Sequence, residues 1–282
     1  MLAAAWNQSG DLLAVSSGET IQWFDPQSIE NRQVAPVGVF SRALVFHPTR
    51  PELLLSGSND GLVRIWNIFS AEQQQALEAN PKGINRLVIS PDGSTLATAG
   101  NDALLYLWDL RDGTELEPLI GGSFAVPDLA FIAPESGGYQ LVSVDGGVIR
   151  VRDVATSRLV ISIRTGGPVQ AIAVSPDGRQ VAAARQEGLV QLWSLESGEL
   201  LWEQTLLPKD EAWSLVFDPA GALLFSGWRS GELCWLLVEQ PEQNKCQPAH
   251  TRPLGVLAFH PAGHTLLTGG YDGWLYFWQI KR

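Results

Sequence analysis

Two histidines lie close enough in the sequence to suggest a metal site. His260 and His264 are four residues apart, but they flank a Pro-Ala-Gly turn rather than lying on a helix face. No cysteine or carboxylate pair accompanies them at the spacing of a zinc site. The Asp-Gly pairs at Asp60, Asp145 and Asp272 could suggest calcium, but Asp-Gly is a favoured turn dipeptide. We therefore predict no metal site.

The other residues and motifs that could carry chemistry do not form an active site either. Cys234 falls in a predicted strand and is expected to be a small buried residue. Cys246 falls in a predicted loop, and no histidine lies near it in sequence to activate its thiol. The sequence contains neither a GxxxxGKS/T phosphate-binding loop nor a GxSxG nucleophile motif. We predict no catalytic residue and no cofactor.

The composition is that of a globular protein and disfavours binding to nucleic acid or membranes. Of 282 residues 45% are hydrophobic, and 19 Lys and Arg against 30 Asp and Glu give a net charge of -11. An acidic chain without a basic cluster is poorly suited to neutralise phosphates or to bind an anionic membrane surface. Two cysteines cannot form a disulfide scaffold, which suggests a reducing compartment, and neither a signal peptide nor a membrane span is visible. We expect a cytoplasmic protein.

The elements that would position functional residues recur with a period near 42 residues. Four of five Pro-containing turns, such as SPDG (90–93) and HPAG (260–263), place Gly at the fourth position of a type I turn. Most of these turns follow an apolar residue that ends a short strand. At spacings of 40 to 43 residues, these apolar residues are Trp6, Phe46, Ile89, Phe131, Val174, Phe217 and Phe259.

A second series of residues closes the following strand pair. The residues one and three positions before each of them are apolar, which is the period-two burial of a strand. The segment SAEQQQALEAN (70–80) tolerates a helix, and we expect a loop or an outer hairpin there. About 40 residues with four short strands, repeated seven times, predict an all-β, seven-bladed β-propeller of four-stranded antiparallel blades. At spacings of 41 to 44 residues, the closing residues are Phe24, Trp66, Trp108, Arg152, Trp193, Leu236 and Trp278.

Three segments carry a resemblance to a known family. SGSNDGLVRIWN (56–67), TAGNDALLYLWDL (98–110) and TGGYDGWLYFWQI (268–280) resemble the WD-repeat family, and the resemblance covers essentially the whole chain. Units one, four and six depart from the family pattern because they close on Phe24, Arg152 and Leu236 instead of Trp. The Gly-His pair expected early in each repeat is nearly absent. The resemblance implies peptide or protein partners.

The resemblance also implies a buried polar network of Asp, His, Ser or Thr, and Trp within a blade. In unit seven the matching residues are His250, Thr268, Asp272 and Trp278. Such a group of side chains could be mistaken for a catalytic site. Because buried polar groups pair with one another in folded proteins, we expect this network to be structural.

The interaction face of the family lies just inside the first strand of each unit and just before the Asp turn. Among the matching residues, one group on units six and seven combines aromatic side chains with an arginine, and such residues dominate binding hot spots. An alternative is that Trp213 or Trp228 packs between blades. The candidate residues are Arg42, Asn85, Gln170 and Trp213 from the first position, with Trp228, Arg229 and Tyr271 near the second.

The last blade is expected to lack its outermost strand, because the chain opens on an inner strand and stops just past residues 273–280. The edge strand would then expose free backbone groups together with Trp274, Tyr276, Phe277 and Trp278. Three explanations stay open: a three-stranded blade tolerated as it is, a chain that is part of a longer native protein, or a strand donated by a partner.

We predict one WD-repeat β-propeller domain over residues 1–282 that acts as a non-catalytic scaffold for protein or peptide partners. The alternative is a domain that senses a small ligand in the propeller channel. We do not expect an enzyme, because the fold alone provides no chemistry and no site is visible in the sequence.

Overall fold

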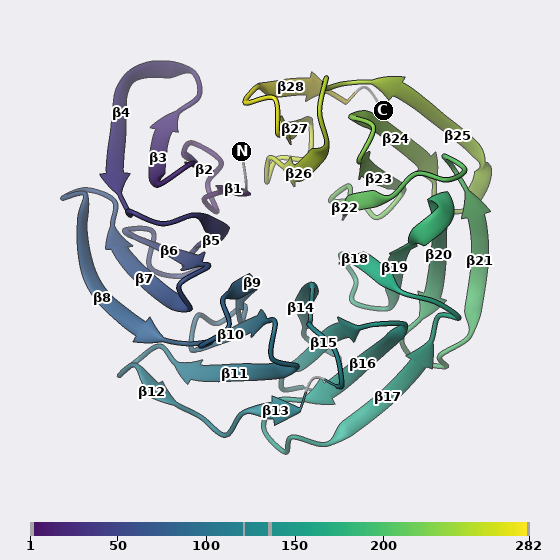
Figure 1. Ribbon diagram of the computed structural model, residues 1–282, viewed down its shortest axis with the longest axis horizontal. Helices are drawn as coiled ribbons and strands as arrows, with labels where there is room; N and C mark the ends of the chain where they lie inside the picture. Colours follow the sequence, from purple (N-terminus) through teal and green to yellow (C-terminus); the bar gives the residue numbers. More distant parts are fainter. Residues whose placement is uncertain (1–2, 121, 135–136, 281–282) are drawn as a thin grey trace. The chain divides into compact units, whose positions relative to one another are not determined.

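Seven antiparallel sheets follow one another along residues 3–120, 122–134 and 137–280, which are the residues that this computed structural model describes (Figure 1). Each sheet is built from consecutive short strands, in the order that the repeats predict. The fold is an all-β, seven-bladed β-propeller, as predicted, and the sheets are called blades one to seven. Among the described residues the one helical element is the 3₁₀ turn η1 (Gln186–Gly188), so none of their helices could span a membrane.

The chain divides into two compact units, Met1–Pro127 and Asp128–Arg282. The first unit contains blades one to three. Their strands are β1 (Ala3–Trp6), β2 (Leu13–Ser17), β3 (Thr20–Asp25) and β4 (Ser28–Pro36) in blade one; β5 (Ser41–Phe46), β6 (Leu53–Ser58), β7 (Leu62–Asn67) and β8 (Glu72–Glu78) in blade two; and β9 (Ile84–Ile89), β10 (Thr95–Gly100), β11 (Leu104–Asp109), β12 (Thr114–Glu115) and β13 (Leu119–Ile120) in blade three.

Two details of the first unit refine the sequence-based expectation. In blade three the outer position is shared by the two short strands β12 and β13, which both pair with β11. The segment 70–80 contains the outer strand β8, whose residues are exposed except for Leu77. Its Glu and Gln residues tolerate a strand because an outer strand needs little apolar surface.

The second unit contains blades four to seven, and the last of them has three strands. This matches the prediction that blade seven lacks its outermost strand. The strands are β14 (Asp128–Ile132), β15 (Gln140–Asp145), β16 (Val148–Asp153) and β17 (Leu159–Arg164) in blade four; β18 (Val169–Val174), β19 (Gln180–Arg185), β20 (Leu189–Ser194) and β21 (Leu200–Thr205) in blade five; β22 (Ala212–Phe217), β23 (Leu223–Trp228), β24 (Glu232–Leu237) and β25 (Gln240–Pro248) in blade six; and β26 (Leu254–Phe259), β27 (Thr265–Gly270) and β28 (Leu275–Gln279) in blade seven.

The predicted turns between the first and second strands form as expected. In blade three the Gly93 amide donates to the Ser90 carbonyl at 2.8 Å, and Gly93 has a φ of +78°. A Cβ atom there would also lie 2.4 Å from the His47 ring, so glycine is required on both grounds. Gly178, Gly221 and Gly263 make the same bond at 2.8 Å in their own turns.

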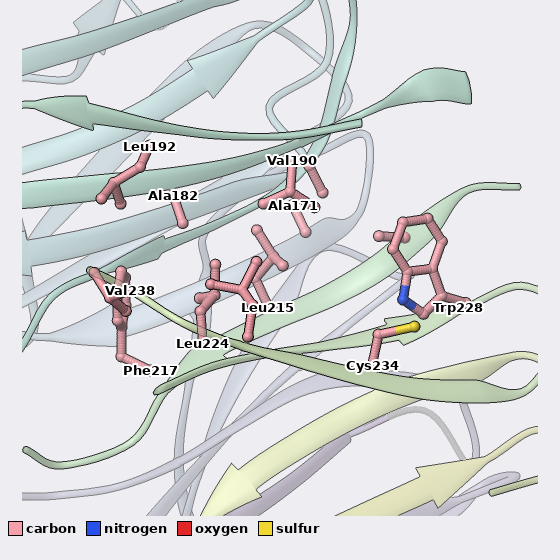
Figure 2. Close-up of a cluster of buried hydrophobic side chains, with 13 residues drawn as sticks. Ala171, Ala182, Val190, Leu192, Leu215, Phe217, Leu224, Trp228, Cys234 and Val238 are labelled. Atoms are coloured by element: carbon pink, nitrogen blue, oxygen red, sulfur yellow. The ribbon is translucent and has the colours of Figure 1, made fainter. Parts of the chain in front are cut away.

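Within each unit, neighbouring blades pack through the apolar faces of their sheets. Between blades five and six, small residues such as Ala171 and Ala182 leave room for large ones such as Phe217 and Trp228 (Figure 2). The side chains interlock at the density of a protein interior. The outer strand β21 adds Trp202, whose indole N–H donates to the Val238 carbonyl of blade six at 2.9 Å.

The two cysteines correct the sequence-based expectation. Cys246 lies on strand β25 rather than in a loop, and it forms a disulfide with Cys234 on the neighbouring strand β24. The two residues face each other directly in the strand register, with their Cα atoms 4.0 Å apart. Cys234 is buried as expected, but as one half of a crosslink that fastens the outer strand of blade six.

The structure brings together the four residues of the expected polar network. Trp278 Nε1 donates to Thr268 Oγ1 at 3.0 Å, and Thr268 Oγ1 lies 2.9 Å from His250 Nε2. His250 Nδ1 lies 3.0 Å from Asp272 Oδ1. Because the Asp272 carboxylate can only accept, His250 Nδ1–H donates to it, and Nε2 of the neutral imidazole then accepts from the Thr268 hydroxyl. The network joins the end of blade six to the second and third strands of blade seven.

Asp272 also accepts backbone bonds from Thr251 at 2.9 Å and from Trp274 at 3.1 Å. Burial of its carboxyl group raises the pKa, but the bonds from these two amides and from His250 outweigh that effect. The pKa of Asp272 therefore lies below its usual value, and the charged form stabilises the fold.

A related network in the first unit uses an asparagine where the family pattern has histidine. Asn80 Nδ2 donates to Asp102 Oδ1 at 3.0 Å, and the Tyr106 hydroxyl donates to Asp102 Oδ2 at 3.0 Å. A search for histidine could not find this residue. The signal in the sequence is its place, 22 residues before Asp102, which equals the separation of His250 and Asp272.

Reducing the Cys234–Cys246 disulfide should lower the free energy of unfolding by about 3 kcal/mol, because the crosslink closes a short loop in the unfolded chain. Urea unfolding with and without dithiothreitol measures the difference. The Cys246→Ala variant should match the reduced wild type and should not respond to the reductant. Equal stability of oxidised and reduced wild type would contradict this expectation.

Replacing Asp272 by Asn should cost about 1–3 kcal/mol of stability at pH 7, because one accepting carboxylate oxygen becomes an NH2 donor that faces other donors of the network. Since the pKa is lowered in the folded state, this stabilisation exists above the usual pKa of 3.8 and is lost as pH falls through the folded value. Wild type and variant should therefore converge in urea unfolding below about pH 4. The control Glu242→Gln, an exposed carboxylate on β25, should change stability by less than about 0.5 kcal/mol. A difference that persists unchanged at low pH would disprove the role of the carboxylate.

Candidate functional site

A β-bulge recurs at the second residue of the first strand in five blades. The strand register skips one residue at this position in β5, β9, β18, β22 and β26. The extra residue of a bulge leaves the hydrogen-bond ladder, and its side chain is redirected. The sequence-predicted interaction residues occupy four of the five positions. The bulged residues are Arg42, Asn85, Gln170, Trp213 and Gly255.

The residue that follows the second strand is held beside the start of the first strand of the same blade. The Arg229 amide donates to the Glu211 carbonyl at 2.9 Å, and the Tyr271 amide donates to the Pro253 carbonyl at 2.9 Å. In the first unit, the Asn59 amide donates to Phe40 at 3.1 Å. These backbone bonds place the turn residues and the bulged residues at the same end of each blade.

In the first unit the two candidate residues differ in their surroundings. Arg42 is exposed on β5. Asn85 is half-buried, and its side-chain amide donates to Asn101 Oδ1 at 3.0 Å and to the Val126 carbonyl at 3.4 Å. Asn85 therefore holds the turn of its own blade, while Arg42 has an exposed charge.

In the second unit Trp213 and Tyr271 form an exposed aromatic pair. Their ring centroids lie 5.4 Å apart at an interplanar angle of 79°, the edge-to-face geometry that aromatic rings favour. Trp213 is 36% exposed and Tyr271 is 45% exposed. The pair spans blades six and seven, which places two large apolar surfaces together in contact with solvent.

Gly255 makes this pair possible. It is the bulged residue of blade seven, and a Cβ atom there would lie 3.1 Å from Tyr271 Cε2 and 4.0 Å from Trp213 Cε3. A residue with a Cβ atom would require the tyrosine ring to shift by a few tenths of an ångström. The sequence pattern missed Gly255 because a residue without a side chain carries no chemistry of its own.

Arg229 completes the group on blade six. Its side chain is 63% exposed, and its guanidinium makes a long contact of 3.5 Å with Glu211. An ion pair at this distance in solvent contributes little energy, so the guanidinium is available to a partner. Gln170 is exposed on the neighbouring inner strand β18.

Trp228 does not belong to this surface. Its side chain is completely buried in the cluster between blades five and six, and its indole N–H donates to Ser226 Oγ at 2.9 Å. Figure 2 shows it beside Cys234. Trp228 therefore has the packing role that the sequence left open, because it ends a buried strand whose face meets blade five.

The edge of blade seven forms a second candidate surface. Trp274 precedes β28 and is 65% exposed, while Tyr276 and Phe277 on the strand are 42% and 45% exposed. Trp278 is half-buried, because it belongs to the network with Thr268 and packs against a buried cluster made by residues of blades six and seven.

Comparison with known families identifies repeats along the chain. The family described as WD domain, G-beta repeat (WD40) matches residues 36–67, 71–109, 158–194 and 242–279. The matches lie in both units and contain the four closing tryptophans of the sequence analysis, Trp66, Trp108, Trp193 and Trp278.

Several relatives share this similarity at low identity. The chain is 25% identical to the target of rapamycin complex subunit wat1 of Schizosaccharomyces pombe, over 84% of this chain and 77% of the relative. It is 25% identical to actin-interacting protein 1-2 of Arabidopsis thaliana over 100% of this chain and 46% of the relative. It is 27% identical to the human echinoderm microtubule-associated protein-like 2 over 81% of this chain and 35% of the relative. The chain thus spans less than half the length of the last two relatives. Because the matched repeats together cover more than half of its residues, the chain belongs to the WD40 repeat family.

Proposed function

We propose that residues 1–282 form a single, non-catalytic scaffold domain, and that a peptide or protein partner docks on the surface made by Trp213, Tyr271 and Arg229. The observation that carries this proposal is the exposed edge-to-face pair over Gly255. Exposure of two large aromatic rings to solvent does not stabilise the folded chain, whereas a bound partner would remove the rings from water.

The chemistry of the surface suits recognition. Trp and Tyr bury a large area and lose little side-chain entropy, and Arg offers a planar set of donors to a carboxylate or carbonyl. Backbone bonds hold Arg229 and Tyr271 in place, so little ordering is needed on binding.

The relatives support protein partners in general terms. Their names describe a subunit of a complex, an actin-interacting protein and a microtubule-associated protein. The alternative of a small-ligand sensor has no comparable support among these relatives.

The proposed cytoplasmic location can be tested through the cysteines. Disulfides are rare in reducing compartments, so protein trapped directly from its native cells with an alkylating reagent should carry free thiols at Cys234 and Cys246. Mass spectrometry of the alkylated peptides measures the reduced fraction. Quantitative oxidation of the pair in the cell would contradict a cytoplasmic location.

The double substitution Trp213→Ala and Arg229→Ala should remove partner binding while leaving the fold intact, because both side chains lie at the surface. Truncating a hot-spot residue costs about 2 kcal/mol or more, a loss of roughly 30-fold in affinity. Affinity capture from native extract with quantitative mass spectrometry measures the loss. The control Phe69→Ala removes another aromatic ring, 76% exposed in the first unit, and should retain the partners. Unchanged capture by the double variant would exclude this surface.

A further inference from the structure

Six of the seven blades carry an outer strand that pairs antiparallel with the third strand. These pairs join β3 to β4, β7 to β8, β11 to β12 and β13, β16 to β17, β20 to β21, and β24 to β25. In blade seven the sheet ends at β28 within the described residues. Blade seven is thus the exception to a pattern that the other blades repeat.

The backbone of β28 presents hydrogen-bonding groups in the direction of a fourth strand. The Ile280 amide donates to the His264 carbonyl at 2.9 Å, and the Trp274 carbonyl accepts from Gly270 at 3.3 Å, so these residues point toward the β27 side. Because alternate residues of an antiparallel strand point to opposite sides, Leu275 and Gln279 direct their N–H and C=O groups away from β27. Blade six shows the same arrangement with its fourth strand in place.

A groove lies alongside this edge. It has a volume of about 600 Å³, between the outer strand β25 of blade six and the end of β28. Apolar side chains such as Phe225, Trp235 and Leu237 line it, together with Trp278 and Ile280. In Figure 1 the strand β25 runs along the outer side of β24, so the groove lies where the outer strand of blade seven would neighbour β25.

Side chains of a fourth strand would enter this groove. In blade six, Cys234 and Leu236 face blade five, because they belong to the buried cluster between these blades. The corresponding residues of blade seven are Tyr276 and Trp278, and Trp278 packs toward blade six. Residues of an added strand that lie opposite Tyr276 and Trp278 would therefore point into the groove.

The charge of the groove indicates the kind of strand that fits. Lys245 on β25 is the one ionisable residue among those that line the groove, in a chain whose net charge is -11. An apolar residue opposite Trp278 and an acidic residue opposite Tyr276 would fill the groove and pair with Lys245. A second copy of β28 does not meet this requirement, because residues 274–280 contain no acidic side chain.

We propose that β28 binds an extended segment of a partner protein as an antiparallel fourth strand, and that this segment directs an apolar and an acidic side chain into the groove beside Lys245. This site is separate from the Trp213 surface. Backbone pairing would supply affinity, and the two side chains would supply specificity.

The chain itself provides a probe with this pattern. Strand β21 is the outer strand of blade five, and its Glu203 accepts a bond from Gln191 at 2.6 Å on the face turned toward blade four. Leu200 lies opposite Trp193 on the same face, because the register skips Leu201, and Trp202 points the other way, toward blade six. A synthetic peptide copying residues 198–207 would therefore present Leu200 and Glu203 to the groove of blade seven.

Binding of this peptide to the intact chain tests the proposal. We expect saturable binding by fluorescence anisotropy and slower hydrogen exchange at the Leu275 and Gln279 amides. A peptide with Gln204→Pro, which cannot donate a backbone bond opposite Leu275, should bind at least tenfold more weakly. The double variant Trp213→Ala and Arg229→Ala should bind the peptide as wild type does. If the Trp213 surface turned out not to bind a partner, this result would be unaffected.

A charge exchange identifies the groove as the binding site. Lys245→Glu should weaken binding of the peptide about tenfold or more, and a peptide with Glu203→Lys should bind this variant better than it binds wild type. The control Lys82→Glu makes the same change of charge at an exposed site in the first unit and should have no effect.

Three results would overturn the proposal. The first is an absence of binding at peptide concentrations up to about 1 mM. The second is an equal effect of Lys245→Glu and Lys82→Glu. The third is protection of the Leu275 and Gln279 amides from hydrogen exchange before peptide is added, which would show that the edge is already covered. If this protection rises with protein concentration, a second copy of the chain covers the edge.

Discussion

The packing of sheet against sheet is the constraint on which the rest of this structure depends. Each blade is too thin to form a core alone, so its apolar side chains must be buried by the faces of its neighbours. Blades five and six show how this works, because alanines on one sheet receive the large side chains of the next. Polar groups drawn into these interfaces must find partners, which explains the chain of bonds from Trp278 to Asp272 and the related pair of Asn80 and Asp102.

The residue type varies at positions that lie outside this packing. The bulge in the first strand takes one residue out of the ladder, so its side chain can change without disturbing the sheet. In blades two, three, five, six and seven this position is occupied by Arg42, Asn85, Gln170, Trp213 and Gly255, respectively. The glycine matters most for the proposed surface, since its missing side chain leaves space for an aromatic pair contributed by two blades.

The same packing explains why the edge of blade seven is unusual. Its third strand carries Tyr276, Phe277 and Trp278, but no fourth strand follows it in the described residues. The groove beside it is bounded by β25, which the disulfide between Cys234 and Cys246 fastens to β24. When the two cysteines are oxidised, one wall of the proposed strand-binding site is covalently anchored, so their oxidation state bears on both stability and the site.

The sequence by itself determined the repeat, the seven sheets, the turns with their glycines and the short last blade. These features follow from the alternation of apolar and polar residues along each strand and from the residue types at the turns. Both can be seen within a single repeat of about 40 residues. Only the tertiary structure decided that Trp228 is buried, that Cys246 faces Cys234 and that Trp213 meets Tyr271 over Gly255. Those outcomes depend on strand register and on the contact between blades, and both arise from long-range pairing that the pattern of a single repeat does not contain.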